Sequence, residues 1–173
     1  MRESLKNKQL RMQRIITTLY ETYPNSKCSL EHRSPFQLLI STMLSAQCTD
    51  DRVNKVTPDL FKHYPTAQSM ASAPVEHLAE LVRSTGFFNS KSKNMSACAQ
   101  TLMQEHQGEV PADLDALVKL PGVGRKTANV VLGTGFHIPG LVVDTHVIRI
   151  ANLLRMTNQK DAVKIEVELQ PII

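Results

Sequence analysis

The residues of this chain that could do chemistry gather in one short segment, LPGVGRK at 120–126. Its glycines separate two runs with helical spacing, so Lys126 falls just inside the N-terminus of a helix. The positive end of the helix dipole disfavours an ammonium there, and desolvation in a cleft acts in the same direction. Both effects favour a neutral amine, which is a nucleophile. Taken alone, a lysine at this position is more often solvated or a plain phosphate contact.

The turn before this lysine suits an anion. Gly122 and Gly124 can take backbone angles that other residues avoid, and they place no side chains over the main-chain amides. Amides at the start of a helix are good phosphate ligands. Leu120 and Val123 would pack the two helices together and leave the amides pointing outward. A tight turn that binds nothing is the alternative, and the glycine pattern by itself does not exclude it.

A carboxylate completes the set of candidates. Asp144 follows the apolar run Leu141–Val143 and precedes a helical pattern that reaches Leu154, so it is well placed as an N-cap. It lies too far along the chain from Lys126 to share the same helix. Capping a helix and taking part in catalysis are compatible roles for one carboxylate.

The elements that must position these residues are helical. Apolar residues recur at helical spacing, and no alternation of period two runs long enough to indicate a strand. The chain is therefore predicted to be all-α. The segment 36–47 is apolar nearly all round, so we expect it to be a central, buried helix. The other expected helices cover 5–23, 50–56, 57–64, 66–73, 75–85, 90–107, 111–118, 125–132, 144–154 and 160–169.

Composition limits the class of protein. The formal net charge is +4, which permits a polyanionic partner without demanding one. No apolar run approaches the roughly 20 residues that a membrane span needs. The N-terminus has no apolar signal core, so we expect a cytoplasmic protein that is not secreted. Cys28, Cys48 and Cys98 are odd in number and far apart, and they predict neither a disulfide framework nor a metal site.

Longer segments carry a family pattern. They are LLISTMLSAQCTDDRVNKV at 38–56, TGFFNSKSKN at 85–94, GEVPADLDALVKL at 108–120, LPGVGRKTANVVL at 120–132 and VVDTHVIRIANLL at 142–154. Together they resemble the endonuclease III family of helix-hairpin-helix DNA glycosylases, in the family's order and spacing over nearly the whole chain. The resemblance implies a two-lobed helical fold. One lobe would span 24–133, with the helix-hairpin-helix at 112–132, and the second would combine 1–23 with 134–173.

The resemblance implies a bifunctional base-excision-repair enzyme, a DNA N-glycosylase that is also an AP lyase. Lys126 would attack C1′ of a damaged nucleotide, expel the base and form a Schiff base with the opened sugar. Asp144 would help to deprotonate the amine and stabilise positive charge at the sugar. β-Elimination would then cut the strand. The expected substrates are oxidised pyrimidines and abasic sites in double-stranded DNA, and the expected enzyme is a bacterial-type, nucleoid-associated monomer.

The resemblance also implies DNA contacts. Gln47 would fill the gap left by the extruded nucleotide, and Phe87 would be an apolar wedge. Lys91 suits a phosphate contact, although a solvated lysine would look the same. We expect Phe88 to be a core residue and His146 to have a structural role. The hairpin residues expected at the DNA are Leu120, Gly122, Val123, Gly124 and Arg125.

The chain departs from the family at its C-terminal end. Most members carry four cysteines there that bind a [4Fe-4S] cluster, and this sequence stops before that region. We expect no cofactor in the chain as given, and a [4Fe-4S] cluster only if the protein continues beyond residue 173. The apolar ending Pro171-Ile172-Ile173 suggests that the chain was cut short. An incomplete second lobe with exposed apolar surface is therefore expected.

Two other functions compete with this one. The related adenine glycosylases that act on mismatches usually lack a lysine at this hairpin position, so Lys126 disfavours them. A non-catalytic DNA-binding remnant of such an enzyme would keep the hairpin and lose turnover. Such a remnant would form no covalent adduct with DNA, which separates it from an enzyme.

Overall fold

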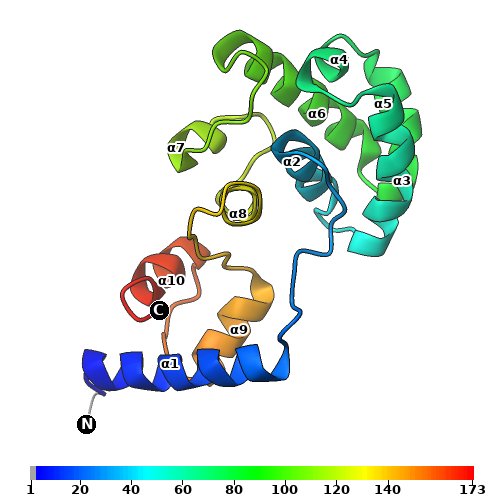
Figure 1. Cartoon of the computed structure of the whole chain (residues 1–173). Coiled ribbons are helices and arrows are strands. Elements are labelled where there is room, and N and C mark those ends of the chain that lie inside the picture. Colours follow the sequence, from blue (N-terminus) through cyan, green and yellow to red (C-terminus); the bar gives the residue numbers. More distant parts are fainter. Residues whose placement is uncertain (1–2) are drawn as a thin grey trace. The chain divides into compact units, whose positions relative to one another are not determined.

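The computed structural model describes residues 3–173, and all regular structure in these residues is helical, as predicted (Figure 1). The chain divides into two compact units. The larger unit is Cys28–Gly140, and the smaller combines Met1–Lys27 with Leu141–Ile173. Both boundaries of the larger unit thus lie a few residues later in the chain than the expected 24 and 133. In the described residues, no helix has the length and apolar character that crossing a membrane would require.

The larger unit is built around α2 (Pro35–Leu44). The Ser34 hydroxyl caps it by accepting from a backbone N–H of the first turn, and Pro35 takes the first helical position. Every residue from Leu38 to Leu44 is buried. The predicted central, buried helix is therefore confirmed, but it ends at Leu44 and leaves Gln47 in the turn that follows.

The remaining helices of the larger unit pack around α2 or on one another (Figure 1). α2 contacts α3, α6, α8 and η2, while α4 and α5 lie along α6. In chain order they are α3 (Asp50–His63), α4 (Ala67–Ala71), α5 (Val75–Leu81), the 3-10 turn η1 (Arg83–Thr85), α6 (Phe88–Glu105), α7 (Leu114–Leu117), α8 (Arg125–Val130) and the π turn η2 (Val131–Gly135).

α3 is one helix where the sequence predicted two. Thr57 and Pro58 have the pattern of a new helix start, but α3 runs through both residues. A proline inside a helix removes an amide donor and costs about 3 kcal/mol. α3 tolerates Pro58 because that residue is exposed, while Val53, Thr57 and Leu60 are buried along the opposite side. The predicted break at residue 57 was wrong because packing outweighs the local signal.

The second helix of the hairpin also runs further than predicted. α8 passes without a break into η2, so the winding continues through Gly133, where the sequence predicted a break. Gly135 lies against α2, and a side-chain carbon there would come within 3.3 Å of the Leu38 Cδ2 atom. The hairpin is thus tied directly to the central helix.

In its described residues, the smaller unit has three helices and its own core. They are α1 (Leu5–Thr22), α9 (Thr145–Leu153) and α10 (Ala162–Leu169). Ile172 is buried, although it is the second-last residue, while Leu153 and Val167 are exposed. This unit therefore carries the exposed apolar side chains that were expected of it. Its buried apolar residues are Met12, Val143, Ala151, Met156, Ile165, Leu169 and Ile172.

Two basic residues of α1 hold the smaller unit together. The Lys8 Nζ atom donates to the Met156 carbonyl at 3.0 Å, and the Arg11 Nη1 atom donates to the Leu154 carbonyl at 2.6 Å. Leu154 is the C-cap of α9, where carbonyls lack partners within the helix. Two cations of the basic N-terminal stretch thus bind a helix end of their own unit.

Candidate nucleic-acid interface

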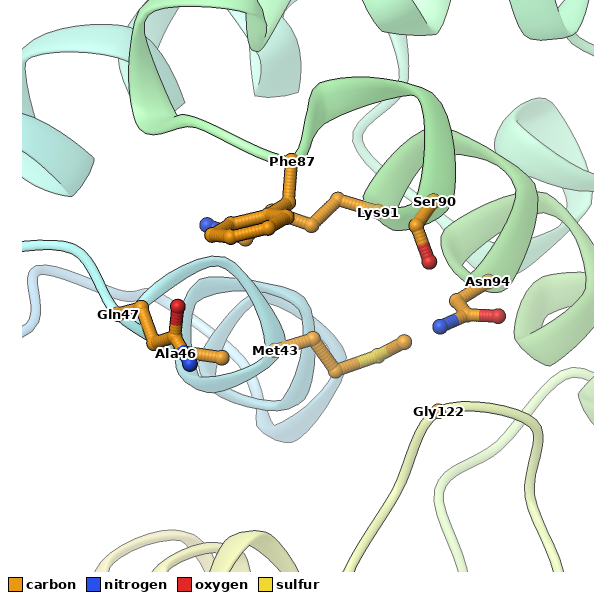
Figure 2. A pocket seen from close by; sticks show the side chains of 8 residues that line it. All are labelled: Met43, Ala46, Gln47, Phe87, Ser90, Lys91, Asn94 and Gly122. Atoms are coloured by element: carbon orange, nitrogen blue, oxygen red, sulfur yellow. The ribbon is translucent and has the colours of Figure 1, made fainter.

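A pocket of about 260 Å³ in the larger unit gathers four of the predicted site residues, Gln47, Phe87, Lys91 and Gly122 (Figure 2). Its walls come from the turn after α2, the first turns of α6 and the hairpin between α7 and α8. Lys126 is not among the residues that line it. The complete lining is Met43, Ala46, Gln47, Phe87, Ser90, Lys91, Asn94 and Gly122.

Gln47 stands at the rim in an unusual backbone conformation. Its φ is 52°, a region that non-glycine residues rarely occupy. The turn that imposes it is closed by a hydrogen bond of 3.1 Å from the Cys48 amide to the Ser45 carbonyl. The Gln47 side chain is exposed. The turn therefore presents an amide that can both donate and accept hydrogen bonds.

Phe87 has the same two properties on the other wall. Its φ is 48°, and 68% of its surface is exposed. An exposed aromatic ring of this size offers a large apolar surface against which a partner can pack. Phe88 behaves differently: it is half-buried against the core, and the Arg83 guanidinium lies 5.9 Å from its ring centroid. The structure thus supports the core role expected for Phe88.

Lys91 does not present its charge to a partner. Only 7% of its surface is exposed, and its Nζ atom donates to the carbonyls of Leu44 and Thr85, each at 2.8 Å. Burial lowers the pKa of this ammonium. This geometry argues against the expected phosphate contact, because the side chain is buried and two of its three N–H groups are directed at main-chain oxygens. The exposed lysine of this helix is Lys93, two residues further on.

The hairpin is anchored by its apolar residues. Leu120 and Val123 are buried in the core of the larger unit, so neither side chain reaches a ligand and only their backbone could. Gly122 has a φ of 76°, and a Cβ atom there would lie 2.8 Å from the Asn94 Cβ atom. Both the conformation and the contact demand glycine. Sequence reasoning gave no role to Asn94, although it closes the segment 85–94 that carries part of the resemblance.

Gly124 has a different reason to be glycine. Its φ of −91° and ψ of 168° are open to any residue, and an added Cβ would meet nothing within 4 Å. Gly124 therefore does not use a backbone angle that other residues avoid, whereas Gly122 does. Gly124 is the N-cap of α8 and supplies no side-chain cap. Because Gly124 has no side chain, the space over the start of α8 stays open.

Lys126 is the second residue of α8, as predicted, and its side chain is exposed. The buried residues of this helix, Ala128 and Asn129, lie in its following turn. The expected desolvation of Lys126 is thus not found, because its side chain points away from the core. Arg125, at the first helical position, is half-buried.

Asp144 belongs to the smaller unit and caps α9, as the sequence predicted. Its Oδ1 atom accepts from the amides of His146 and Val147, each at 2.9 Å. The side chain of Asp144 is half-buried and that of His146 is exposed. The carboxylate is therefore oriented by its own helix, through residues only two and three positions away.

In the described residues, no group of three or more His, Cys, Asp or Glu side chains could hold a metal ion. A [4Fe-4S] cluster takes four thiolates. Cys98 is unsuited to such a set, since it is buried in the core of the larger unit and burial raises its pKa to about 12. Cys28 and Cys48 are half-buried free thiols. These three cysteines do not fit the cluster.

Comparison with known proteins gives one answer. The family described as "HhH-GPD superfamily base excision DNA repair protein" matches residues 40–173. The chain is 46% identical over 168 residues to Endonuclease III of Synechocystis sp., covering 96% of this chain and 77% of that protein. It is 41% identical over 167 residues to Endonuclease III of Escherichia coli K12, covering 96% and 79% of the two chains.

Solved structures agree with the sequence relatives. A non-covalent Endonuclease III–DNA complex and a trapped Endonuclease III–DNA covalent intermediate each match with a TM-score of 0.90 and 42% identity, covering 95% of this chain and 78% of theirs. A thermostable thymine-DNA glycosylase, 21% identical with a TM-score of 0.82, shares the fold. The chain thus belongs to the HhH-GPD superfamily of base excision DNA repair proteins, and within it to the endonuclease III family.

Proposed function

We propose that this chain is a DNA glycosylase and AP lyase that acts on oxidised pyrimidines and abasic sites in duplex DNA through a Schiff base at Lys126. The observation that carries the proposal is the position of Lys126. It is an exposed lysine at the second residue of α8, directly after a turn that is tied to the core by Leu120 and Val123. One solved relative is a trapped Endonuclease III–DNA covalent intermediate, and a covalent intermediate requires a nucleophile in that protein.

Binding to the duplex is the first step. A glycosidic bond inside stacked DNA cannot be reached, so the damaged nucleotide must leave the helix. Gln47 and Phe87 are exposed on opposite walls of one pocket and are suited to fill the resulting gap. The amide of Gln47 would pair with the orphaned base, and the Phe87 ring would replace lost stacking. The open space at Gly124 would admit a DNA phosphate to the start of α8.

Chemistry follows at the extruded nucleotide. The Lys126 amine attacks C1′, the C1′–N bond breaks, and the base leaves as an anion that takes a proton from water. Asp144 takes a proton from the attacking nitrogen and stabilises the positive charge on the sugar. The C1′–O4′ bond then breaks, the ring oxygen takes the proton held by Asp144, and a Schiff base remains between Nζ and C1′. Loss of a proton from C2′ then expels the 3′ phosphate by β-elimination, and water releases the lysine from C1′.

A borohydride trapping experiment tests this function. The purified chain is mixed with duplexes that contain an oxidised pyrimidine or an abasic site, and reduction converts any Schiff base into a stable protein–DNA adduct. We expect an adduct that is lost in Lys126→Ala. Lys119→Ala removes another exposed lysine of the same hairpin and should keep the adduct.

Circular dichroism establishes that each variant folds, and a binding titration establishes that each still holds DNA. A folded wild-type chain that binds DNA and forms no adduct would refute the lyase proposal and leave a non-catalytic DNA-binding protein. An adduct that survives in Lys126→Ala would place the nucleophile elsewhere.

A further inference from the structure

The two exposed side chains at the rim of the pocket are carried by turns of similar construction. Gln47 lies three residues after Leu44, the last residue of α2, and Phe87 lies two residues after Thr85, the last residue of η1. Both have positive φ, which is strained for a residue with a side chain. Such conformations persist only where the surroundings enforce them. Something must hold both turns.

Lys91 contacts both turns at their starting points. Its Nζ atom lies 2.8 Å from the Leu44 carbonyl oxygen and 2.8 Å from the Thr85 carbonyl oxygen. Each oxygen belongs to the end of a helix, where carbonyls lack partners within the helix and carry partial negative charge. Leu44 and Thr85 are themselves buried, so water does not supply an alternative donor. One ammonium thus joins two chain segments that are otherwise distant in sequence.

This lysine occupies a position that is unfavourable for a cation. It is the fourth residue of α6, close to the positive end of the helix dipole, and its side chain is buried. A methionine or leucine would fill a similar volume without those costs. The hydrogen bonds to the two carbonyls are interactions that neither methionine nor leucine could make, and they offset the cost of a cation at this position.

We propose that Lys91 is a positioning residue, whose ammonium clamps the Gln47 turn to the Phe87 turn and so presets the spacing of the two side chains that enter the DNA. The inference rests on the proposed function for the role of these side chains, but the clamp itself is a property of the free protein. Side chains that already have the spacing of the bound state lose less conformational entropy when DNA binds. The free-energy cost of inserting them is therefore lower.

The first test uses the free protein and no DNA. Hydrogen exchange is measured at the amides of Cys48, Thr85 and Ser90, which are hydrogen-bonded within or beside the two turns. In Lys91→Met these amides should exchange about tenfold faster or more, since two charge-assisted bonds are lost. The Ala128 amide in α8 serves as a reference and should change much less. Lys93→Met removes the same charge from an exposed position of α6 and should leave all of them unchanged.

The second test follows insertion. A duplex carries a stable abasic-site analogue opposite 2-aminopurine, whose fluorescence changes when a side chain displaces its stacking. Lys91→Met should lower the amplitude several-fold while the dependence of binding on salt stays that of the wild type. Lys91→Arg, which keeps charge and donors, should recover part of the amplitude. If Lys91→Met proves unfolded by circular dichroism, Lys91→Gln replaces it in both tests.

The outcomes separate the clamp from other roles. Unchanged exchange in a folded Lys91→Met variant would overturn the clamp. A salt slope lowered by about 0.9, the effect of one lost phosphate contact, together with unchanged exchange would show that Lys91 binds DNA directly. A wild-type chain that gives no fluorescence change would count against the proposed insertion, while the exchange measurement would still decide whether Lys91 joins the two turns.

Discussion

The two units of the chain orient their candidate site residues by different means. In the larger unit the determining contacts join residues that are far apart in sequence: Lys91 bonds to the Leu44 carbonyl, and Gly122 lies against Asn94. In the smaller unit Asp144 is oriented by amides two and three residues away. The first kind of order disappears with the tertiary structure. The second kind includes contacts that form within a single helix turn.

The cores differ in the same sense. The core of the larger unit extends from Leu30 to Leu132 and contains most of α2, whereas that of the smaller unit consists of seven buried apolar residues. Exposed leucine and valine side chains remain on α9 and α10. The side chains that line the pocket are therefore held in place by a large buried apolar core. Asp144 caps a helix in the unit with the smaller core.

We expect the largest effect from Asp144→Asn, a substitution that can keep the helix cap while it removes the carboxylate. Asn caps helices about as well as Asp, so Asp144→Asn should leave α9 intact. It cannot take a proton as a carboxylate does, and the rate of base removal should fall by about 10²–10⁴-fold. Single-turnover kinetics on a lesion duplex measures this. Asp161→Asn, which alters the N-cap of α10 in the same unit, is the matched control and should keep its activity. A rate within threefold of wild type in Asp144→Asn would end the catalytic assignment.

Substitutions in the two cores come next. Ile40→Ala and Ile165→Ala each remove a fully buried side chain and should cost about 2–5 kcal/mol within their own unit. Because the cores are separate, Ile165→Ala should bring forward the unfolding of the smaller unit and leave the larger one nearly unchanged. Urea denaturation followed by amide exchange in each unit tests this. A single transition that shifts equally for both variants would show that the units unfold together.

The hairpin glycines give a smaller effect with a clear contrast. Gly122→Ala should destabilise the larger unit by about 1–3 kcal/mol, since its φ of 76° is strained for alanine and the new methyl group meets Asn94. Gly124→Ala should leave stability unchanged, because its backbone is extended and its surroundings are open. If Gly124 makes room for phosphate, this second variant should instead weaken DNA binding. Thermal denaturation and a binding titration on both variants distinguish the two roles.

The smallest effect is expected on α1. Lys8→Met removes the bond to the Met156 carbonyl and should lower the stability of the smaller unit by about 1 kcal/mol. Lys6→Met, an exposed position of the same helix, controls for the change in charge and helix propensity. Equal stability of the two variants would mean that this contact does not contribute.

Features set by neighbouring residues could be predicted from the sequence. The caps at Ser34 and Asp144, the all-helical class and the position of Lys126 at the start of α8 follow from local rules, and the structure has them. The other expected site residues were predicted from the resemblance to the endonuclease III family. In these cases the deciding contacts lie within a few residues of the motif itself.

Features set by tertiary packing could not be predicted in this way. Pro58 lies inside a helix because its neighbours are buried, which the proline–threonine pattern does not reveal. In the sequence, Lys91 cannot be told from an exposed lysine. Its burial depends on tertiary structure, which brings it to the Leu44 carbonyl, 47 residues away. The need for glycine at 122 depends on Asn94, which the turn sequence alone does not contain.

The smaller unit is assembled from the two ends of the chain, and this has a consequence for how the protein is made. α1 is synthesised before the larger unit, yet the carbonyl that Lys8 binds belongs to Met156, 148 residues later. The larger unit lies wholly between these segments and can fold while synthesis continues, since domains generally fold as units. Met12 of α1 therefore stays exposed to water until α9 and α10 have been synthesised. The nascent chain can therefore complete the pocket of the larger unit before the segment that carries Asp144 has been synthesised.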